Sequence, residues 1–146
     1  MTIKIKITKL EHCRHLPEYK TKGASGMDLY AAIDKPAVLK PLERVLIPSG
    51  IQIELPEGYE AQVRARSGLA VKHGISLINA IGTIDSDYRG EVCIGLVNLS
   101  NEEYTVNPDD RIAQLVIMRI EKAEIEETDE LSESARGLGG FGSTGM

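Results

Sequence analysis

The chain has 146 residues, a net charge of −5 and 42% hydrophobic residues, the composition of a single soluble domain with a buried core. The acidic balance argues against binding to nucleic-acid backbones, and no apolar run is long enough to span a membrane. Two distant cysteines, Cys13 and Cys93, and an N-terminus without a continuous apolar segment predict a cytoplasmic protein without disulfides.

Apolar and polar residues alternate along most of the chain, which is typical of strands that are buried on one face. Stretches rich in proline, glycine and aspartate, such as Pro48–Gly50, predict turns between these segments. The expected strands, in chain order, are residues 3–7, 44–49, 51–55, 59–65, 92–99 and 112–120. Only residues 67–74 have the pattern of a helix. Short strands at these intervals predict an all-β fold of the sandwich or jelly-roll type with one short helix.

The last part of the chain differs in composition from the rest. It is acidic at first, then rich in glycine and small residues, and it has too few apolar groups to form a core of its own. We therefore divide the chain into a core, residues 1–122, and a flexible C-terminal arm, residues 123–146. The amides of the glycines can converge on an anion, and Arg136 offers a guanidinium fork that suits phosphate. The arm is expected to close over a ligand as a lid, although Phe141 could instead simply anchor it to the core.

Three glycines of the arm spell the dinucleotide-binding pattern G-x-G-x-x-G, namely Gly137, Gly139 and Gly142. That pattern holds a pyrophosphate only where it follows a strand and opens a helix. Four residues remain after Gly142, too few for such a helix. The dinucleotide interpretation therefore fails, and the rest of any phosphate site has to come from elsewhere.

Arginines in this acidic protein lie in or beside polar, glycine-bearing stretches at the ends of expected strands. In "RARSGLA", residues 64–70, an expected strand runs into the helix and Ser67 occupies the expected N-cap, where backbone amides could meet a phosphate. Taken singly, each arginine is more simply explained as half of a surface ion pair. Taken together, they favour a triphosphate ligand. These arginines are Arg64, Arg66, Arg89, Arg111 and Arg136.

Asp85 is the best candidate for a general base, because it ends the otherwise apolar run "IGTID". Burial there would leave its carboxylate poorly solvated and able to accept a proton from a water that attacks phosphorus. The alternative is that Asp85 and Asp87 are merely residues of a hairpin turn. The residues alone leave both possibilities open.

The histidines do not indicate a metal site. His12, Cys13 and His15 lie on one short segment and cannot converge on one ion, and no second pair of ligands follows. We expect a solvated surface stretch at these positions and a structural role for His73.

Five segments, read in order, resemble the motifs of the trimeric dUTPase family: residues 24–31, 64–70, 79–92, 109–117 and 136–145. The resemblance implies hydrolysis of dUTP to dUMP and pyrophosphate, with Mg²⁺ as cofactor and attack at the α-phosphorus. Such an activity limits uracil incorporation into DNA and supplies dUMP for dTMP synthesis. It also implies a jelly roll of the β-clip type, assembled as a homotrimer in which each site takes motifs from three chains and the arm crosses onto a neighbour.

The resemblance also implies roles for single residues. Asp85 would activate the attacking water, and Asp28 would support the water shell of the metal. Asn79 would open a β-hairpin whose backbone reads uracil, and Tyr88 would pack against the deoxyribose where a ribose 2′-hydroxyl would collide. The implied substrate-binding residues are Arg66, Ser67, Gly68, Asn79, Gly82, Thr83, Ile84, Tyr88, Gln114, Arg136, Phe141, Gly142, Ser143 and Thr144.

Within this set, Arg66, Ser67 and Gln114 would contact the phosphates, and the ring of Phe141 would stack on uracil. The implied grip on the γ-phosphate comes from Arg136, Ser143 and Thr144.

The fourth motif departs from the family pattern, which usually has glycine before its acidic residue, whereas this chain reads "NPDDR". We expect an altered turn there and an unchanged role for Gln114. Two alternatives remain: a dCTP deaminase, which is built on the same jelly roll and needs a glutamate near the base, and a trimeric binding module without catalysis.

Overall fold

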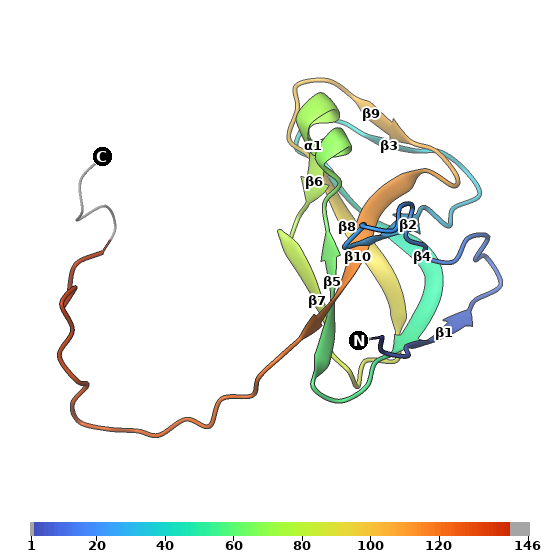
Figure 1. Cartoon of the computed structure of the whole chain (residues 1–146). Helices are drawn as coiled ribbons and strands as arrows, with labels where there is room; N and C mark the ends of the chain where they lie inside the picture. The colour runs from blue at the N-terminus through green and yellow to red at the C-terminus, as the bar shows by residue number, and fades with distance from the viewer. Residues whose placement is uncertain (1, 141–146) are drawn as a thin grey trace.

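Ten strands and one short helix make up the regular structure of residues 2–140, the part of the chain described by the computed structural model (Figure 1). They form two four-stranded antiparallel sheets, ordered β1-β4-β8-β6 and β2-β10-β5-β7, and a two-stranded sheet, β3-β9. The predicted all-β, jelly-roll fold with one short helix is confirmed. The bounds are β1 Lys6–Lys9, β2 Met27–Tyr30, β3 Ala37–Leu39, β4 Arg44–Glu54, β5 Tyr59–Arg64, α1 Ser67–His73, β6 Ile75–Leu77, β7 Ile81–Ile84, β8 Glu91–Asn98, β9 Tyr104–Val106 and β10 Arg111–Arg119.

One hydrophobic cluster contains residues from both four-stranded sheets and forms the core. Along β8, Val92, Ile94 and Leu96 are buried and alternate with less buried residues, as expected for a strand with one face toward a core. Ala61 and Val63 of β5 contribute to the same cluster from the other sheet. The alternation seen in the sequence therefore corresponds to the inward faces of the two sheets.

Residues 44–49 and 51–55, expected as two strands, form the single strand β4. The stretch Pro48–Gly50, which we expected as a turn, is an irregularity where the register against β8 shifts. Gly50 has φ +74, and a Cβ built there would lie 2.6 Å from Cα of Cys13. Only glycine fits so close an approach with a left-handed backbone. Cys13 itself is buried, so the solvated stretch expected around it was wrong at this residue.

The strands missing from the prediction are the shortest ones. β2, β3, β6, β7 and β9 have three or four residues each, and over such lengths alternation does not stand out in the sequence.

The N-cap of helix α1 lies one residue earlier than expected. The Ala70 N–H donates to the Arg66 carbonyl at 3.0 Å, so Arg66 is the N-cap residue and Ser67 is already the first helical residue. Ser67 as N-cap was therefore wrong. At the other end, Gly74 has φ +68 and donates its N–H to Ala70, a left-handed C-cap that ends the helix.

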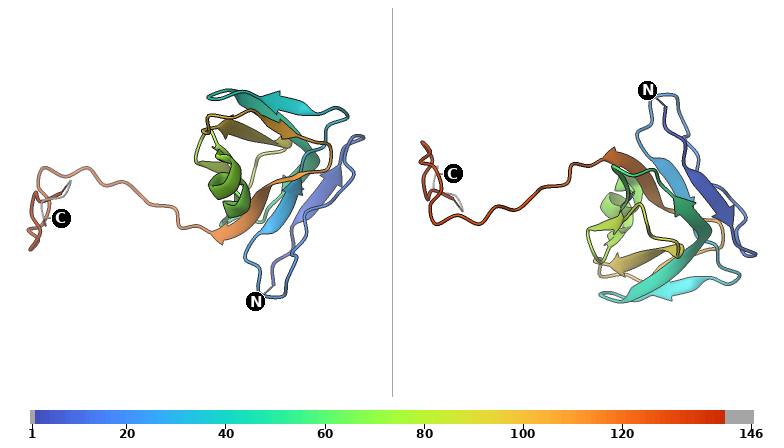
Figure 2. Two further views of the ribbon diagram at one scale, coloured as in Figure 1. Left: turned by 90° about the horizontal axis from the view of Figure 1, so that it is seen from above. Right: turned by 90° about the horizontal axis from the view of Figure 1, so that it is seen from below.

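After β10 the chain leaves the body of the molecule. The Ile120 N–H still donates to the Gly58 carbonyl at 3.0 Å, and the following residues up to 140 run away from the sheets in both views of Figure 2. Hydrogen bonds within residues 123–140 are local, such as the one from Arg136 Nε to the Gly139 carbonyl at 2.8 Å. Within residues 2–140, no helix has the length and apolar character needed to cross a bilayer.

Candidate active site

A pocket of about 380 Å³ opens between β7 and β8 and brings together most of the residues expected around the base and sugar. β6 pairs with β8, whereas β7 pairs with β5, so the two strands that flank Asn79 belong to different sheets. The hairpin expected to begin at Asn79 is not a strand pair, because β7 pairs with β5 whereas β8 pairs with β4 and β6, so β7 and β8 diverge. This divergence leaves space beside β7. The lining residues are Leu46, Val63, Asn79, Gly82, Thr83, Ile84, Asp85, Tyr88, Glu91, Val92 and Cys93.

The floor of this pocket at Asn79 is shaped by a tight backbone. The Ile81 N–H donates to the Asn79 carbonyl at 2.6 Å, and Ala80 between them has φ +60. A Cβ built on Gly82 would lie 3.2 Å from Cβ of Val63 and 3.4 Å from Nδ2 of Asn79. A side chain at position 82 would therefore crowd Val63 and Asn79, and glycine keeps this part of the pocket open.

Asp85 lies directly after β7, at the start of a turn that the Tyr88 N–H closes by donating to the Asp85 carbonyl at 3.1 Å. The side chain of Ile84 points into the core, so the next side chain in the strand direction points outward, and Asp85 is exposed. The expectation of a buried carboxylate is wrong for this chain by itself. Asp85 is a turn residue, and it lines both the pocket and a neighbouring hollow beside Asp87 and Arg89.

Tyr88 forms one wall of the pocket with its ring. Its hydroxyl donates to the Glu91 carbonyl at 3.0 Å, and the side chain remains 46% exposed. The Glu91 carboxylate accepts the Gly50 N–H at 2.8 Å and lies 2.7 Å from Nε2 of His12. Glu91 was not singled out from the sequence, although it lies within the third motif.

Cys93 lines the same pocket from β8. Burial raises the pKa of the Cys93 thiol, and the nearby carboxylate of Glu91 adds a smaller increase in the same direction.

A second group of predicted residues meets where β2, β5 and β10 lie side by side. Asp28, whose side chain is 13% exposed, contacts Arg66 Nε at 3.3 Å and Arg111 Nη1 at 3.1 Å. Arg66 also donates to the Arg111 carbonyl at 2.9 Å. Both arginines are therefore in ion pairs, but they share one carboxylate, so the group retains positive charge. This arrangement suits an anion such as a phosphate.

Gln114 completes this phosphate-side group, which we define as Asp28, Arg66, Arg111 and Gln114. Gln114 of β10 pairs with Asp28 of β2, and its Nε2 donates to the Ala65 carbonyl at 3.0 Å.

A Cβ built on Gly26 would lie 2.5 Å from the side-chain oxygen of Gln114, so a glycine at position 26 is needed for Gln114 to adopt this conformation. Ser67 and Gly68 lie exposed at the start of α1, next to Arg66.

The unusual acidic residue of the fourth motif, Asp109, has φ +65 and donates its N–H to the Ala31 carbonyl at 2.9 Å. Aspartate tolerates this left-handed conformation better than most residues. The Asp109 carboxylate is also held by Arg14 at 3.2 Å. Asp109 thus adopts the conformation that a glycine would take here without strain.

The two groups do not meet within one chain. None of Asp28, Arg66, Ser67 and Gln114 lines the pocket that holds Asn79 and Tyr88. The arm that carries Arg136 runs away from both groups over residues 123–140 (Figure 1). The remaining arm residues of the prediction lie outside the described residues, namely Phe141, Gly142, Ser143 and Thr144.

Within residues 2–140, no group of three or more His, Cys, Asp and Glu side chains could hold a metal ion. Mg²⁺ commonly keeps several waters and binds one or two carboxylates together with substrate phosphates. The single carboxylate of Asp28, beside positively charged groups that attract phosphate, fits an indirect role toward such an ion.

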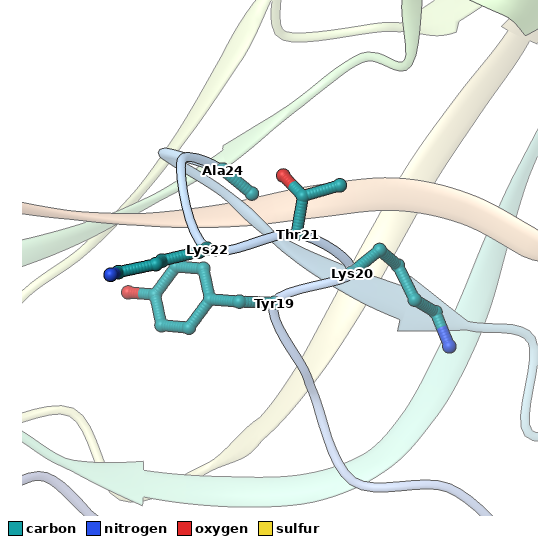
Figure 3. A pocket seen from close by; sticks show the side chains of 5 residues that line it. All are labelled: Tyr19, Lys20, Thr21, Lys22 and Ala24. Atoms are coloured by element: carbon teal, nitrogen blue, oxygen red, sulfur yellow. The ribbon is translucent and has the colours of Figure 1, made fainter.

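An open hollow lies at the loop before the first motif, lined by Tyr19, Lys20, Thr21, Lys22 and Ala24 (Figure 3). Its two lysines point in different directions, so they do not converge on one ligand. Lys20 is already paired with Glu18, whose hydrogen bond raises the pKa of the lysine. None of the predicted site residues lines this hollow.

Comparison with known proteins gives one consistent result. The family model for dUTPase matches residues 13–145. The deoxyuridine 5′-triphosphate nucleotidohydrolase of Finegoldia magna is 59% identical over 130 residues, which cover 89% of this chain and 91% of the relative. The enzyme of the same name from Treponema denticola is 55% identical over 139 residues, which cover 95% of this chain and 96% of the relative.

Similar solved structures are also dUTPases. A mutant dUTPase of Staphylococcus bacteriophage 80alpha with dUpNHpp has a TM-score of 0.89 and 28% identity, covering 99% of this chain and 100% of that chain. A mutant dUTPase from phage phi11 of S. aureus, described for its coordination of a structural Mg(II) ion, has a TM-score of 0.80 and 25% identity, covering 90% of this chain and 100% of that chain.

Proposed function

Because the chain belongs to the dUTPase family, we propose that it hydrolyses dUTP to dUMP and pyrophosphate by attack of water on the α-phosphorus. The general base is Asp85, which follows β7 at the mouth of the pocket. Its exposure in one chain fits a base that a neighbouring subunit and the substrate cover when the site is complete, since exclusion of water strengthens such a base.

The pocket between β7 and β8 takes the deoxyuridine. The backbone of residues 79–84 hydrogen-bonds the polar edge of uracil, and a cytosine there would leave buried polar groups unpaired. The ring of Tyr88 lies against the deoxyribose and rejects a ribose. Asn79, Gly82, Thr83 and Ile84 supply the surroundings of the base.

The triphosphate lies against the phosphate-side group, with Arg66, Ser67, Gly68 and Gln114 as its contacts. Arg66 is oriented by Asp28, because that carboxylate holds its Nε at 3.3 Å. Mg²⁺, when bound, neutralises charge on the phosphate oxygens and is supported through water by Asp28.

The observation that carries the proposal is that the two groups lie apart in one chain although both match one family's site. A homotrimer with shared sites brings them together: the pocket of one subunit meets the phosphate-side group of a second, and the arm of a third closes over both. Exposed apolar side chains on the sheets and in the turn after β6 support an assembly, because an isolated chain would leave them in water. Among them are Leu46 at 67%, Ile78 at 52% and Ile81 at 49% exposure.

The arm, residues 123–146, acts as the lid. Arg136, Ser143 and Thr144 grip the γ-phosphate, Gly142 lets the backbone approach it, and Phe141 stacks on uracil. In the cell the activity limits uracil incorporation into DNA and supplies dUMP for dTMP synthesis. The cytoplasmic location stays a prediction from cysteine usage and the N-terminal sequence.

Pyrophosphate release measured in parallel from dUTP, UTP, dCTP and dTTP tests the proposal. We expect turnover of dUTP only, with ¹⁸O from labelled water appearing in dUMP. Label in the pyrophosphate would contradict attack at the α-phosphorus. Release of ammonia from dCTP would instead identify a deaminase, and binding of dUTP without turnover would identify a binding module.

A further inference from the structure

The ring of Tyr88 occupies the space that a side chain at position 90 would need. A Cβ built on Gly90 would lie 2.2 Å from the Tyr88 hydroxyl oxygen and 2.5 Å from Cζ of the ring. Neither distance is compatible with two unbonded heavy atoms. The φ of Gly90 lies outside the left-handed range, so this glycine is required by space and not by backbone conformation.

The far end of the ring is held as well. The Tyr88 hydroxyl donates to the Glu91 carbonyl at 3.0 Å. Glu91 is itself anchored to β4, because its carboxylate accepts the Gly50 N–H at 2.8 Å. The ring therefore occupies the space left by the missing side chain of Gly90, and the Glu91 carbonyl holds its hydroxyl.

The backbone around the ring is tied down by other contacts. The Tyr88 N–H donates to the Asp85 carbonyl at 3.1 Å, and Gln52 Nε2 of β4 donates to the Arg89 carbonyl at 2.7 Å. The Arg89 guanidinium donates to the Ser86 carbonyl at 2.7 Å. A side chain introduced at position 90 would displace the hydroxyl end of Tyr88 more easily than this backbone, so the ring would turn away and lose its bond to Glu91.

We propose that Gly90 is a specificity-determining residue for the choice between deoxyribonucleotide and ribonucleotide. The inference rests on the proposed function, in which the Tyr88 ring rejects the ribose 2′-hydroxyl. Steric rejection of an added hydroxyl works only if the side chain that blocks it cannot move aside. Gly90 meets this condition by letting the ring lie flat against the turn.

The test compares Gly90→Ala with Gly23→Ala, a matched control because a Cβ on Gly23 meets nothing within 4 Å. The readout is kcat/KM for dUTP divided by kcat/KM for UTP, measured on the assembled full-length protein. We expect about a tenfold fall in this ratio for Gly90→Ala and no change for Gly23→Ala. An unchanged ratio in a folded Gly90→Ala variant overturns the inference.

Tyr88→Phe provides the second arm, because it removes the bond to the Glu91 carbonyl and leaves the backbone and Gly90 unchanged. The ratio of this variant should fall in the same direction as that of Gly90→Ala, but less. An unchanged ratio would contradict the claim that the bond to Glu91 holds the Tyr88 ring in place, even if Gly90→Ala did not fold. The double variant of Gly90→Ala and Tyr88→Ala should show no further loss beyond Tyr88→Ala. Additive losses would mean that position 90 acts by another route. If the unmodified protein releases no pyrophosphate from dUTP, the proposed function fails instead.

Discussion

Replacing Asp28 by asparagine removes the one carboxylate that Arg66 and Arg111 share. Breaking a fully buried ion pair costs about 3–5 kcal/mol, whereas an exposed pair contributes about 0–1 kcal/mol. The two arginine side chains are 28% and 46% exposed, so each contact lies between these limits. We expect a loss of about 1–2 kcal/mol of unfolding free energy, and at about 2–4 °C per kcal/mol a fall in Tm of roughly 2–8 °C.

The same change should impair catalysis, because Arg66 loses the contact that orients its guanidinium. A misplaced phosphate contact lowers kcat/KM for dUTP by about tenfold to a hundredfold. Thermal unfolding and steady-state kinetics at one protein concentration measure both effects. Asp34→Asn is the matched control, since Asp34 is 84% exposed and pairs with Arg14 on the surface. If Asp28→Asn behaves like Asp34→Asn in both measurements, the shared-carboxylate reasoning is refuted.

Asp85→Asn should lower kcat by about a thousandfold or more while dUpNHpp still binds, as titration calorimetry would show; substantial turnover would remove Asp85 as the base. A chain truncated before Arg136 should lose most of its hydrolysis but remain a trimer by light scattering, slightly lighter than the intact protein at about 48 kDa for three chains of 16.0 kDa, and a dissociated variant would contradict the lid. Gly50→Ala should destabilise by about 1–3 kcal/mol in denaturant unfolding, because its φ of +74 and the 2.6 Å approach to the facing loop exclude a side chain. Alkylation of Cys93 should be slow at pH 7 and accelerate as the pH rises beyond the ordinary range for a thiol, because burial raises its pKa. Nucleotide should slow this alkylation further in a mass-spectrometric time course, and equal rates with and without dUpNHpp would place Cys93 outside the nucleotide pocket.

The errors in the sequence prediction have physical causes that the structure makes clear. Pro48–Gly50 has the composition of a turn, yet β4 continues through it, because pairing with β8 on both sides holds the strand together. The run that ends in Asp85 suggested burial, but the reversal of side-chain direction from Ile84 to the next residue directs the carboxylate outward. The first error concerns pairing between segments that lie far apart in the chain, and the second concerns the direction of a single side chain.

Period-two alternation was sufficient to predict an all-β fold, because the inward faces of long strands such as β8 and β10 must be apolar wherever they lie in the chain. The order of five short motifs was sufficient to assign the family, since residue types at close spacing reflect local backbone chemistry. The tertiary structure alone decided that Arg66 and Arg111 share Asp28, that a pocket opens between β7 and β8, and that the Tyr88 ring needs a glycine at position 90. These features depend on distances between side chains brought together by strand pairing, and strand pairing is a property of the folded sheets.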